Sequence, residues 1–190
     1  MVIGLIRHGE TDWNAEKRIQ GQKDIALNEN GIRQAKALAE YLRQDPWDAI
    51  VASDLTRAMT TAETIAAACG ISRVYSDRRL RERYYGDIEG TTLAEREKVW
   101  GEHWRDFDHR IESDEAVRAR GIVAIRDYTE RLTVGRILFV SHGSLIRQVL
   151  ADLLPEQEIG VIHNTSLTVL ERSDGRWACK TFNCVQHLKK

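Results

Sequence analysis

The chain has 190 residues, of which 42% are hydrophobic and 30% are charged, as is usual for a soluble globular protein. Its formal net charge is -1 at pH 7, so no overall basic field would draw it to nucleic acid or to a membrane. No apolar run approaches the length of a membrane span. We therefore expect one compact domain over residues 1–190, with neither nucleic acid nor membrane as a partner.

The cysteines and the amino terminus indicate the compartment. Cys69, Cys179 and Cys184 are odd in number and lack the spacing of a zinc site, so we expect buried or free thiols in a reducing environment. The first residues enter a predicted strand directly, without the basic and long apolar regions of a secretory signal. Both features predict a cytoplasmic protein.

The first predicted element is a short buried strand over residues 2–6, which ends in Arg7-His8-Gly9. The carboxyl end of such a strand opens into the ligand crevice of an α/β sheet. Arg7 offers a fork of donors for phosphate or carboxylate, and His8 is a nucleophile near neutral pH. We expect Gly9 to leave room for a ligand. Alone, however, this ending would indicate only an arginine paired at the surface and a histidine that closes a strand.

Further elements follow at regular intervals. In chain order they are helix 27–42, strand 47–52, helix 58–69, strand 71–75, helix 117–132, strand 137–140, helix 145–154 and the strands 166–170 and 177–182, which a hairpin joins through 173–175. Strands that alternate with helices predict an α/β fold with a largely parallel sheet covered on both faces.

The second helix carries a further cation at its start. Ser53 or Asp54 would be its N-cap, and Gly70 would end it. Arg57 then lies in the first turn, where free backbone N–H groups already favour an anion. Taken alone, Arg57 would equally be a solvated surface cation.

A segment at about 83–118 differs in character from the rest. It is dense in charge, carries Trp100, Trp104 and Phe107, and lacks a clear apolar period. We expect a partly helical excursion over one edge of the sheet. Two interpretations stay open for it, a solvated connection or a cover over the substrate.

A second strand ends in the same way as the first. Residues 137–140 lead directly into Ser141-His142-Gly143, and packing alone does not explain two buried strands that both deliver His-Gly. If the strands are parallel, His8 and His142 meet at one edge together with Arg7 and Arg57. This predicts a small cationic pocket suited to a phosphoryl group.

Metal binding is the competing use of two histidines. No carboxylate or cysteine joins them at ligand spacing, and neighbouring arginines would disfavour a divalent cation. We therefore expect no metal and no cofactor.

The pocket predicts phosphoryl transfer through a phosphohistidine. One histidine would attack phosphorus, and the arginines with the other imidazole would stabilise the charge on the oxygens. A leaving alkoxide needs a proton, for which Glu10, Glu82 and Glu89 are all candidates. These considerations choose neither the acid nor the attacking histidine.

An ordered set of motifs runs through most of the chain. They are Leu5 to Thr11 with Trp13-Asn14, Gln20-Gly21, Leu27 to Gly31 with Gln34-Ala35, Ser53-Asp54-Leu55 with Arg57-Ala58, Leu80-Arg81-Glu82 with Gly86 and Glu89-Gly90, and Val140 to Gly143. Together they resemble the histidine phosphatase superfamily, in its phosphoglycerate-mutase-like branch. The resemblance implies a three-layer α/β/α sandwich.

The resemblance also implies roles. His8 is the nucleophile, Arg7, Arg57 and His142 hold the phosphoryl oxygens, and Glu82 is the proton donor that later activates water.

Further positions match residues that line the family's phosphate pocket. These are Asn14 and Gln20, with Gly21 beside them. Asn14 could instead cap a helix, and Gln20 could be a plain loop residue.

Departures from the family's mutases favour a phosphatase that acts on a small phosphorylated metabolite. The excursion is short, Arg105 stands alone where mutases have paired arginines, and only three residues follow His187 where mutases have a tail over the site. In the opposite direction, the run from Glu82 to Gly86 is similar to the mutase form, with Tyr84 where a histidine is usual. Arg83 could then hold a substrate carboxylate, or be solvated.

Three functions therefore stay open. They are a metal-independent phosphomonoesterase, a phosphoglycerate mutase-type transferase, and a non-catalytic phospho-ligand binding module. The presence of both His8 and Glu82 favours an enzyme. The sequence leaves the oligomeric state open, a homodimer included.

Overall fold

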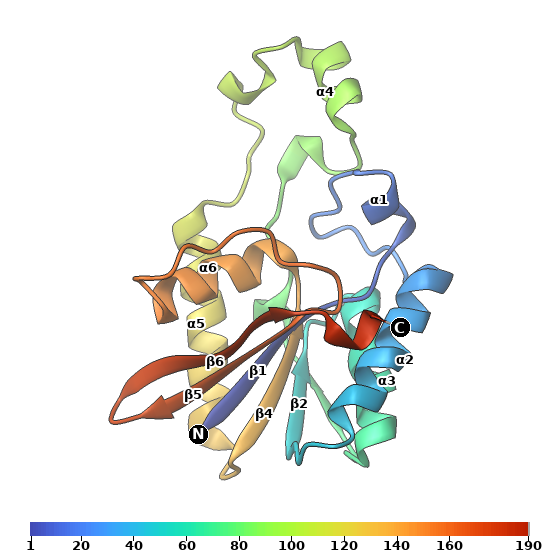
Figure 1. Cartoon of the computed structure of the whole chain (residues 1–190). Coiled ribbons are helices and arrows are strands. Elements are labelled where there is room, and N and C mark those ends of the chain that lie inside the picture. Colours follow the sequence, from blue (N-terminus) through green and yellow to red (C-terminus); the bar gives the residue numbers. More distant parts are fainter. Residues whose placement is uncertain (190) are drawn as a thin grey trace.

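A six-stranded sheet lies at the centre of the protein in a computed structural model, which describes residues 1–189 (Figure 1). Its strands are β1 (Val2–Arg7), β2 (Ala49–Ala52), β3 (Val74–Ser76), β4 (Arg136–Ser141), β5 (Leu167–Ser173) and β6 (Arg176–Cys184). They lie in the order β3-β2-β4-β1-β5-β6. The strands β1 to β4 run parallel, whereas β5 and β6 form an antiparallel hairpin at one edge. The predicted hairpin and the largely parallel sheet are confirmed.

Helices cover both faces of this sheet (Figure 1). They are α1 (Asp12–Ala15), α2 (Glu29–Leu42), α3 (Thr56–Cys69), α4 (Leu93–Trp100), α5 (Asp114–Arg131) and α6 (Gly143–Leu153). Buried side chains of α2 and α3 form one core with the sheet, and those of α5 and α6 form another. The three-layer α/β/α sandwich predicted from the sequence is therefore confirmed.

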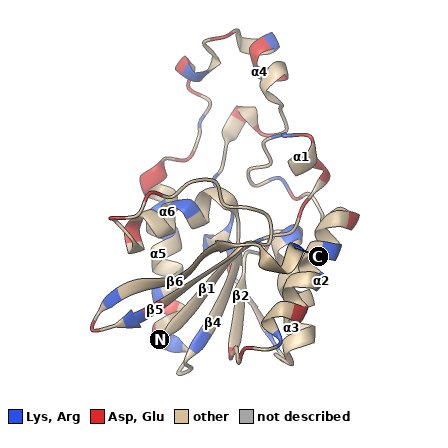
Figure 2. Cartoon of the chain, in the orientation of Figure 1, with Lys and Arg blue, Asp and Glu red and all other residues tan. Residues whose placement is uncertain are grey.

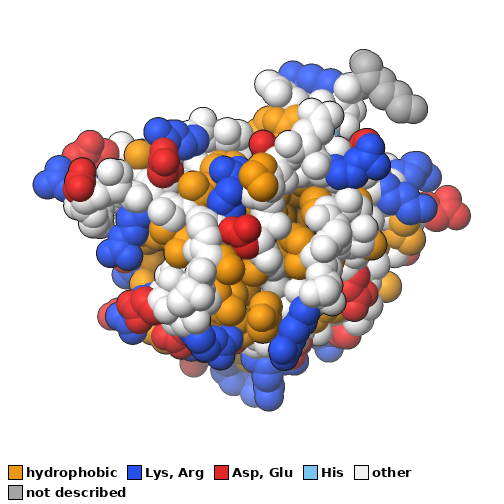
Figure 3. All heavy atoms as spheres, turned by 90° about the horizontal axis from the view of Figure 1, so that it is seen from below, with side chains coloured by type: hydrophobic (Ala, Val, Ile, Leu, Met, Phe, Trp, Pro, Cys, Tyr) orange, Lys and Arg blue, Asp and Glu red, His pale blue; other side chains and the backbone are white. Residues whose placement is uncertain are grey.

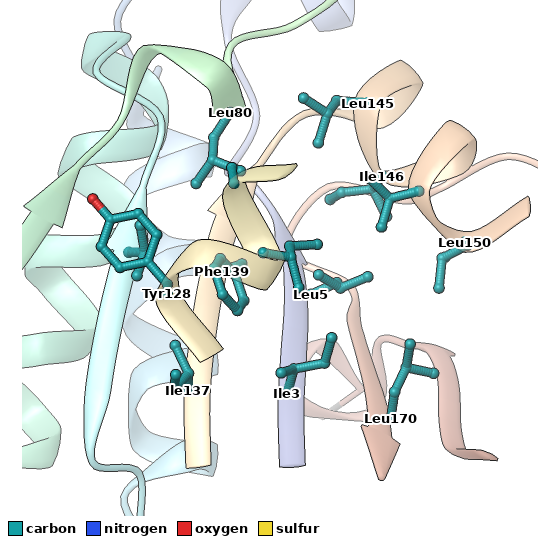
Figure 4. Close-up of a cluster of buried hydrophobic side chains, with 14 of the residues drawn as sticks. Ile3, Leu5, Leu80, Tyr128, Ile137, Phe139, Leu145, Ile146, Leu150 and Leu170 are labelled. Atoms are coloured by element: carbon teal, nitrogen blue, oxygen red, sulfur yellow. The ribbon is translucent and has the colours of Figure 1, made fainter. Parts of the chain in front are cut away.

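The two cores arise because successive side chains of a strand point to opposite faces. On β1, Ile3 and Leu5 pack with α5 and α6, and Ile6 packs with α2 and α3. On β4, Phe139 lies in the first of these cores and Leu138 in the second. Figure 4 shows the first core, where Leu145 and Ile146 of α6 lie over β1. Burial on both faces explains why these strands have continuous apolar sequences.

The start of α3 differs from the prediction. Its N-cap residue is Leu55, and no side chain caps it. Ser53 and Asp54 are engaged elsewhere: the hydroxyl of Ser53 contacts a site histidine, and the carboxylate of Asp54 pairs with Arg81 at 2.6 Å. Neither residue is therefore the predicted cap. At the other end, Gly70 closes the helix with φ of 68°, as predicted.

The starts of two other elements differ by three residues from the prediction. The strand predicted over 71–75 begins only at Val74, because the preceding residues link it to the end of α3. The helix predicted from residue 117 begins at Asp114, with Ser113 as its N-cap. Its first turn is acidic and has no apolar period, which is why periodicity did not detect it.

Residues 83–113 form a cap segment that contains α4. The segment extends beyond the carboxyl ends of β1, β2 and β4, the end of the sheet at which His8 and His142 lie (Figure 1). Two backbone hydrogen bonds close its base: Asp87 N–H donates to His109 O at 3.0 Å, and Glu112 N–H donates to Tyr84 O at 2.9 Å. Figure 2 shows acidic and basic residues along the segment. The two limbs of the cap segment thus meet at a narrow base, and the segment also bonds to the loop below it, where Ile19 N–H donates to Thr91 O at 3.0 Å and Gly90 N–H donates to Ile19 O at 2.7 Å.

The opposite end of the molecule lies where the parallel strands begin. There, hydrophobic side chains lie between charged ones at the surface (Figure 3). The guanidinium of Arg136 lies 4.6 Å from the Trp47 ring centre, so the cation covers part of this apolar surface. Among residues 1–189, no helix is long and apolar enough to cross a bilayer.

The last turn of the described chain docks a histidine against the sandwich. His187 follows β6, and its Nε2 lies 3.1 Å from the hydroxyl of Thr165. Burial lowers the pKa of His187 to about 4. Between pH 4 and 6.5 the unfolded chain therefore binds a proton that the folded chain does not. The stability that this residue contributes is complete above pH 6.5 and is lost as the pH falls toward 4.

We predict that His187→Gln makes the free energy of unfolding depend less on pH between pH 7 and pH 4. Between pH 7 and pH 4 the original chain should lose about 1–2 kcal/mol more unfolding free energy than the variant, allowing for the partial exposure of the ring. Urea unfolding at a series of pH values measures this difference. His103→Gln, which changes an exposed histidine of the cap segment, is the matched control. Equal pH slopes for all three proteins would contradict the prediction.

Candidate active site

The two His-Gly endings meet because β1 and β4 are neighbours in the sheet. Arg7 pairs in register with Ser141, so the next residue of each strand is a histidine at the same edge. The ring centres of His8 and His142 lie 5.1 Å apart, with an angle of 58° between the rings. The neighbouring strand β2 delivers Ser53 to the same place.

The orientation of the His8 ring follows from one hydrogen bond. Its Nδ1 lies 2.6 Å from the carbonyl oxygen of Gly9. A carbonyl only accepts, so Nδ1 carries the proton and Nε2 keeps its lone pair. Backbone bonds restrain the residue further, since Thr165 N–H donates to the carbonyls of Arg7 and His8. This arrangement is that of an oriented imidazole nucleophile.

His142 is held from the other side of the sheet edge. Its Nε2 lies 2.8 Å from the hydroxyl of Ser53, and the ring is fully buried. Its Nδ1 is buried without a partner among the described residues. His142 is also the N-cap residue of α6, which places it beside the free N–H groups of that helix.

Two guanidinium groups, one buried and one half-buried, supply positive charge. Arg57 is fully buried, and its fork donates to the carbonyls of Gly21 at 2.8 Å and Lys23 at 2.7 Å. Arg7 donates to the carbonyl of Ile162 at 2.7 Å. Burial lowers the pKa of both arginines, that of Arg57 to about 10, so both are still cations at pH 7. The Nε atoms of both lack a partner in the described chain.

These cations and the burial determine the protonation of the histidines. Burial lowers the pKa of His8 well below its usual value, and the charges of Arg57 and Arg7 lower it further. The same causes act on His142, again with burial first and Arg57 next. Both rings are therefore neutral near pH 7, as a nucleophile requires. A bound dianion would oppose the charges of the arginines and favour protonation.

A cavity of about 180 Å³ opens in front of these groups. It is lined by Arg7, His8, Asn14, Arg18, Ile19, Gln20, Gly21, Arg57, Glu82 and Tyr85. Asn14, Gln20 and Gly21 therefore line the same cavity as His8, and their contact with phosphate stays a prediction. Asn14 also takes part in a capping box with Thr11 at the start of α1. At Gly21, φ is 55° and a Cβ would lie 1.8 Å from a carboxylate oxygen of Glu89, which leaves room only for glycine.

Of the three candidate acids, only Glu82 lines this cavity. Its carboxylate accepts the backbone N–H groups of Arg83 at 2.8 Å, Ser144 at 3.1 Å and Leu145 at 3.2 Å. The last two belong to the first turn of α6, so the helix N-terminus holds the carboxylate at the edge of the pocket. The carboxylate of Glu10 instead accepts from Asn28, and that of Glu89 accepts from backbone N–H groups, including that of Gln22.

Two expectations require correction. Arg83 is not among the residues that line the cavity: its guanidinium pairs with Asp114, and its side chain is only 15% exposed. It is therefore not solvated, and its pairing with Asp114 competes with any substrate carboxylate. Gly9 does not make room for a ligand either, because a Cβ there would meet the carbonyl oxygen of Gly31 at 2.5 Å. Close packing of the backbone explains this glycine.

Several site residues were not anticipated in their present role. Ser53 was expected to cap a helix, and its position directly after a buried strand was the available signal. Tyr85 lies in a motif that was noted, without a role for its ring. The amide nitrogen of Asn164 lies 3.0 Å from His8 O and 3.2 Å from Asn14 Oδ1. No local pattern marks Asn164, because these contacts connect distant parts of the chain.

Metal-binding side chains are not grouped in the part of the chain described. No three histidine, cysteine, aspartate or glutamate side chains of residues 1–189 lie close enough to hold an ion together. Two histidines beside two arginines form a site for an anion.

Comparison with known proteins identifies the family. A family model described as "Histidine phosphatase superfamily (branch 1)" matches residues 3–185. The chain is 36% identical to phosphoglycerate mutase-like protein 4 of Arabidopsis thaliana, over 99% of this chain and 87% of that one. It is 33% identical to a metal-independent phosphoserine phosphatase of the same plant, over 98% and 82%.

A solved structure agrees. The fold matches a mycobacterial glucosyl-3-phosphoglycerate phosphatase in complex with VO3, with a TM-score of 0.85 and 32% identity over 96% of this chain and 99% of that one. The sandwich, the paired histidines and the match over nearly the whole chain lead to one conclusion: this protein belongs to the histidine phosphatase superfamily.

Proposed function

We propose that the protein is a metal-independent phosphomonoesterase that works through a phosphohistidine at His8. The observation that carries the proposal is the His8 ring, whose Nδ1 is committed to Gly9 O while its Nε2 is free beside the cavity. Arg7 and Arg57 supply the charge that a phosphoryl dianion needs. The names of relatives and neighbours, which include phosphatases, also support it.

In the first step, Nε2 of His8 forms a bond to phosphorus while the bond from phosphorus to the ester oxygen breaks. Arg7, Arg57 and His142 stabilise the charge on the other three oxygens. Glu82, in its protonated form, gives its proton to the departing oxygen, so the alcohol leaves neutral. The protein then holds a phosphohistidine and a Glu82 carboxylate.

In the second step, water enters opposite the histidine. The Glu82 carboxylate takes a proton from this water as its oxygen bonds to phosphorus, and the bond to Nε2 breaks. Inorganic phosphate leaves, and both side chains return to their starting forms. No metal is needed to activate the water, because the phosphohistidine is already a reactive donor.

Hydrolysis is favoured over transfer to a second bound group. A mutase must hold a further anionic part of its substrate. Here neither candidate cation lines the cavity: Arg83 pairs with Asp114, and Arg105 is exposed and lies 4.3 Å from the Trp104 ring centre. We propose a small phosphorylated metabolite as the substrate, with the cap segment as its cover. The mutase stays as the second candidate because of the run from Glu82 to Gly86.

The compartment and the assembly are also proposals. Free thiols at Cys69, Cys179 and Cys184 support the cytoplasm. A homodimer stays open, and sedimentation of the purified protein would decide it.

We predict that p-nitrophenyl phosphate is hydrolysed in the presence of EDTA and that His8→Ala abolishes this turnover. The variant should also lose the acid-labile phosphate label, because alanine lacks the Nε2 atom to which the labelled phosphoryl group would be attached. Acid-quench labelling with a 32P-phosphate ester measures it, and His163→Ala, outside the cavity, is the control. Retained labelling would reassign the nucleophile, and turnover that EDTA abolishes would indicate a metal.

Two further outcomes would change the class of function. Isomerisation of 3-phosphoglycerate at a rate above its hydrolysis would favour the mutase. Absence of turnover together with measurable binding of a phosphopeptide would favour the binding module.

Glu82→Gln is expected to slow esters with poor leaving groups far more than p-nitrophenyl phosphate. A stable phenolate departs without a proton, whereas an alkoxide does not, so the loss should be about 100-fold or more for an alkyl phosphate. Values of kcat/KM for both esters measure the contrast. Equal losses for the two esters would argue against Glu82 as the proton donor.

A further inference from the structure

One half-buried cation outside the cavity contacts the segment that carries Glu82. Arg120 belongs to α5, and its Nη1 donates to the carbonyls of Arg79 at 2.8 Å and Arg81 at 2.5 Å. Its Nη2 donates to the carbonyl of Glu82 itself at 3.0 Å. A single guanidinium therefore holds three backbone oxygens of one short segment. A planar fork of five donors is suited to this task, and an ammonium group is not.

The same guanidinium is fixed by a carboxylate. Its Nε lies 2.7 Å from Glu112 Oε1 and its Nη2 lies 2.9 Å from Glu112 Oε2, and each of the two side chains is only 19% exposed. Glu112 Oε2 in turn accepts the backbone N–H of Tyr84 at 3.1 Å. The pair thus holds the chain on both sides of Glu82, at the base of the cap segment.

Other contacts hold this segment from the remaining sides: Gln22 Nε2 donates to Glu82 O at 3.1 Å, and Arg81 pairs with Asp54 at 2.6 Å. On the inner side, the hydroxyl of Ser141 donates to Leu80 O at 2.7 Å. The Glu82 carboxylate reaches the first turn of α6 at 3.1 and 3.2 Å. From the side of α5, Arg120 contacts the backbone of Glu82 directly, and a shift of the backbone there would move the carboxylate relative to the ester oxygen.

We propose that Arg120, held by Glu112, is a positioning residue that sets the Glu82 carboxylate for proton transfer to the leaving group. The inference rests on the proposed function, in which Glu82 is the acid. Arg120 is not among the residues that line the cavity and takes no part in holding the phosphoryl group. Its loss should therefore weaken acid catalysis selectively.

The test compares two esters in Arg120→Lys. For β-glycerol phosphate, which has a poor leaving group, kcat/KM should fall about tenfold or more, and for p-nitrophenyl phosphate it should fall less than about threefold. The quantity kcat/KM includes the departure of the leaving group, so hydrolysis of the phosphohistidine does not mask the effect. The double variant Arg120→Lys with Glu82→Gln should be no slower than Glu82→Gln alone, because the two changes remove the same contribution.

A control variant and a second variant of the pair accompany Arg120→Lys. Arg118→Lys changes a more exposed arginine of the same helix, 3.9 Å from Asp152, and should change neither ester. Glu112→Gln removes the charge that fixes Arg120 and keeps an oxygen for Tyr84 N–H, so it should reproduce the selective loss to a smaller extent. It also replaces Arg120→Lys if that variant does not fold, as judged by circular dichroism.

The outcomes separate the two proposals. Equal losses for both esters, no loss in folded Arg120→Lys and Glu112→Gln, or multiplicative losses in the double variant would overturn the role of Arg120. In each of these cases the original chain and Glu82→Gln still report on the phosphatase itself. Failure of the original chain to hydrolyse either ester would overturn the proposed function instead.

Discussion

The site depends on positive charge that is buried and has no acidic side chain in contact among residues 1–189. Arg57 is fully buried, and its hydrogen bonds go to the carbonyls of Gly21 and Lys23. Carbonyl dipoles orient a guanidinium without neutralising it, so its charge remains available to an incoming anion. Burial lowers the pKa of His8, and this charge lowers it further, so the ring is neutral. The charge proposed to bind the phosphoryl group thus also favours the neutral form of the proposed nucleophile.

The sequence was sufficient for the fold where the signal is local. The apolar runs of β1 and β4, and their alternating contacts with two cores, follow from strand periodicity. Helix starts were harder to predict. The polar residue before α3, Ser53, was interpreted as a cap although its hydroxyl contacts His142, and the acidic first turn of α5 carried no apolar period. In both cases the tertiary context decided.

Some features of the site were also predictable from the sequence, and others required the fold. The meeting of His8 and His142 was predictable, because two strands with the same ending indicate a shared edge. The role of Glu82 among three glutamates came from the resemblance, and its contact with the N-terminus of α6 required the fold. Arg83 shows what the sequence alone could not predict. Its sequence context suggests a contact with substrate, whereas its guanidinium pairs with Asp114, which is distant in the chain. Long-range pairing of this kind leaves no local trace.

The narrow base of the cap segment has a consequence for how such a protein can diversify. The two limbs of the segment meet where 84–87 lies against 109–112, and residues 89–95 bond to loop 18–22, which lines the cavity. Residues 97–108 lie beyond these contacts and could therefore be exchanged for another loop with little disturbance to the reaction centre. Selectivity toward the organic part of a substrate and the chemistry at phosphorus are then free to evolve separately.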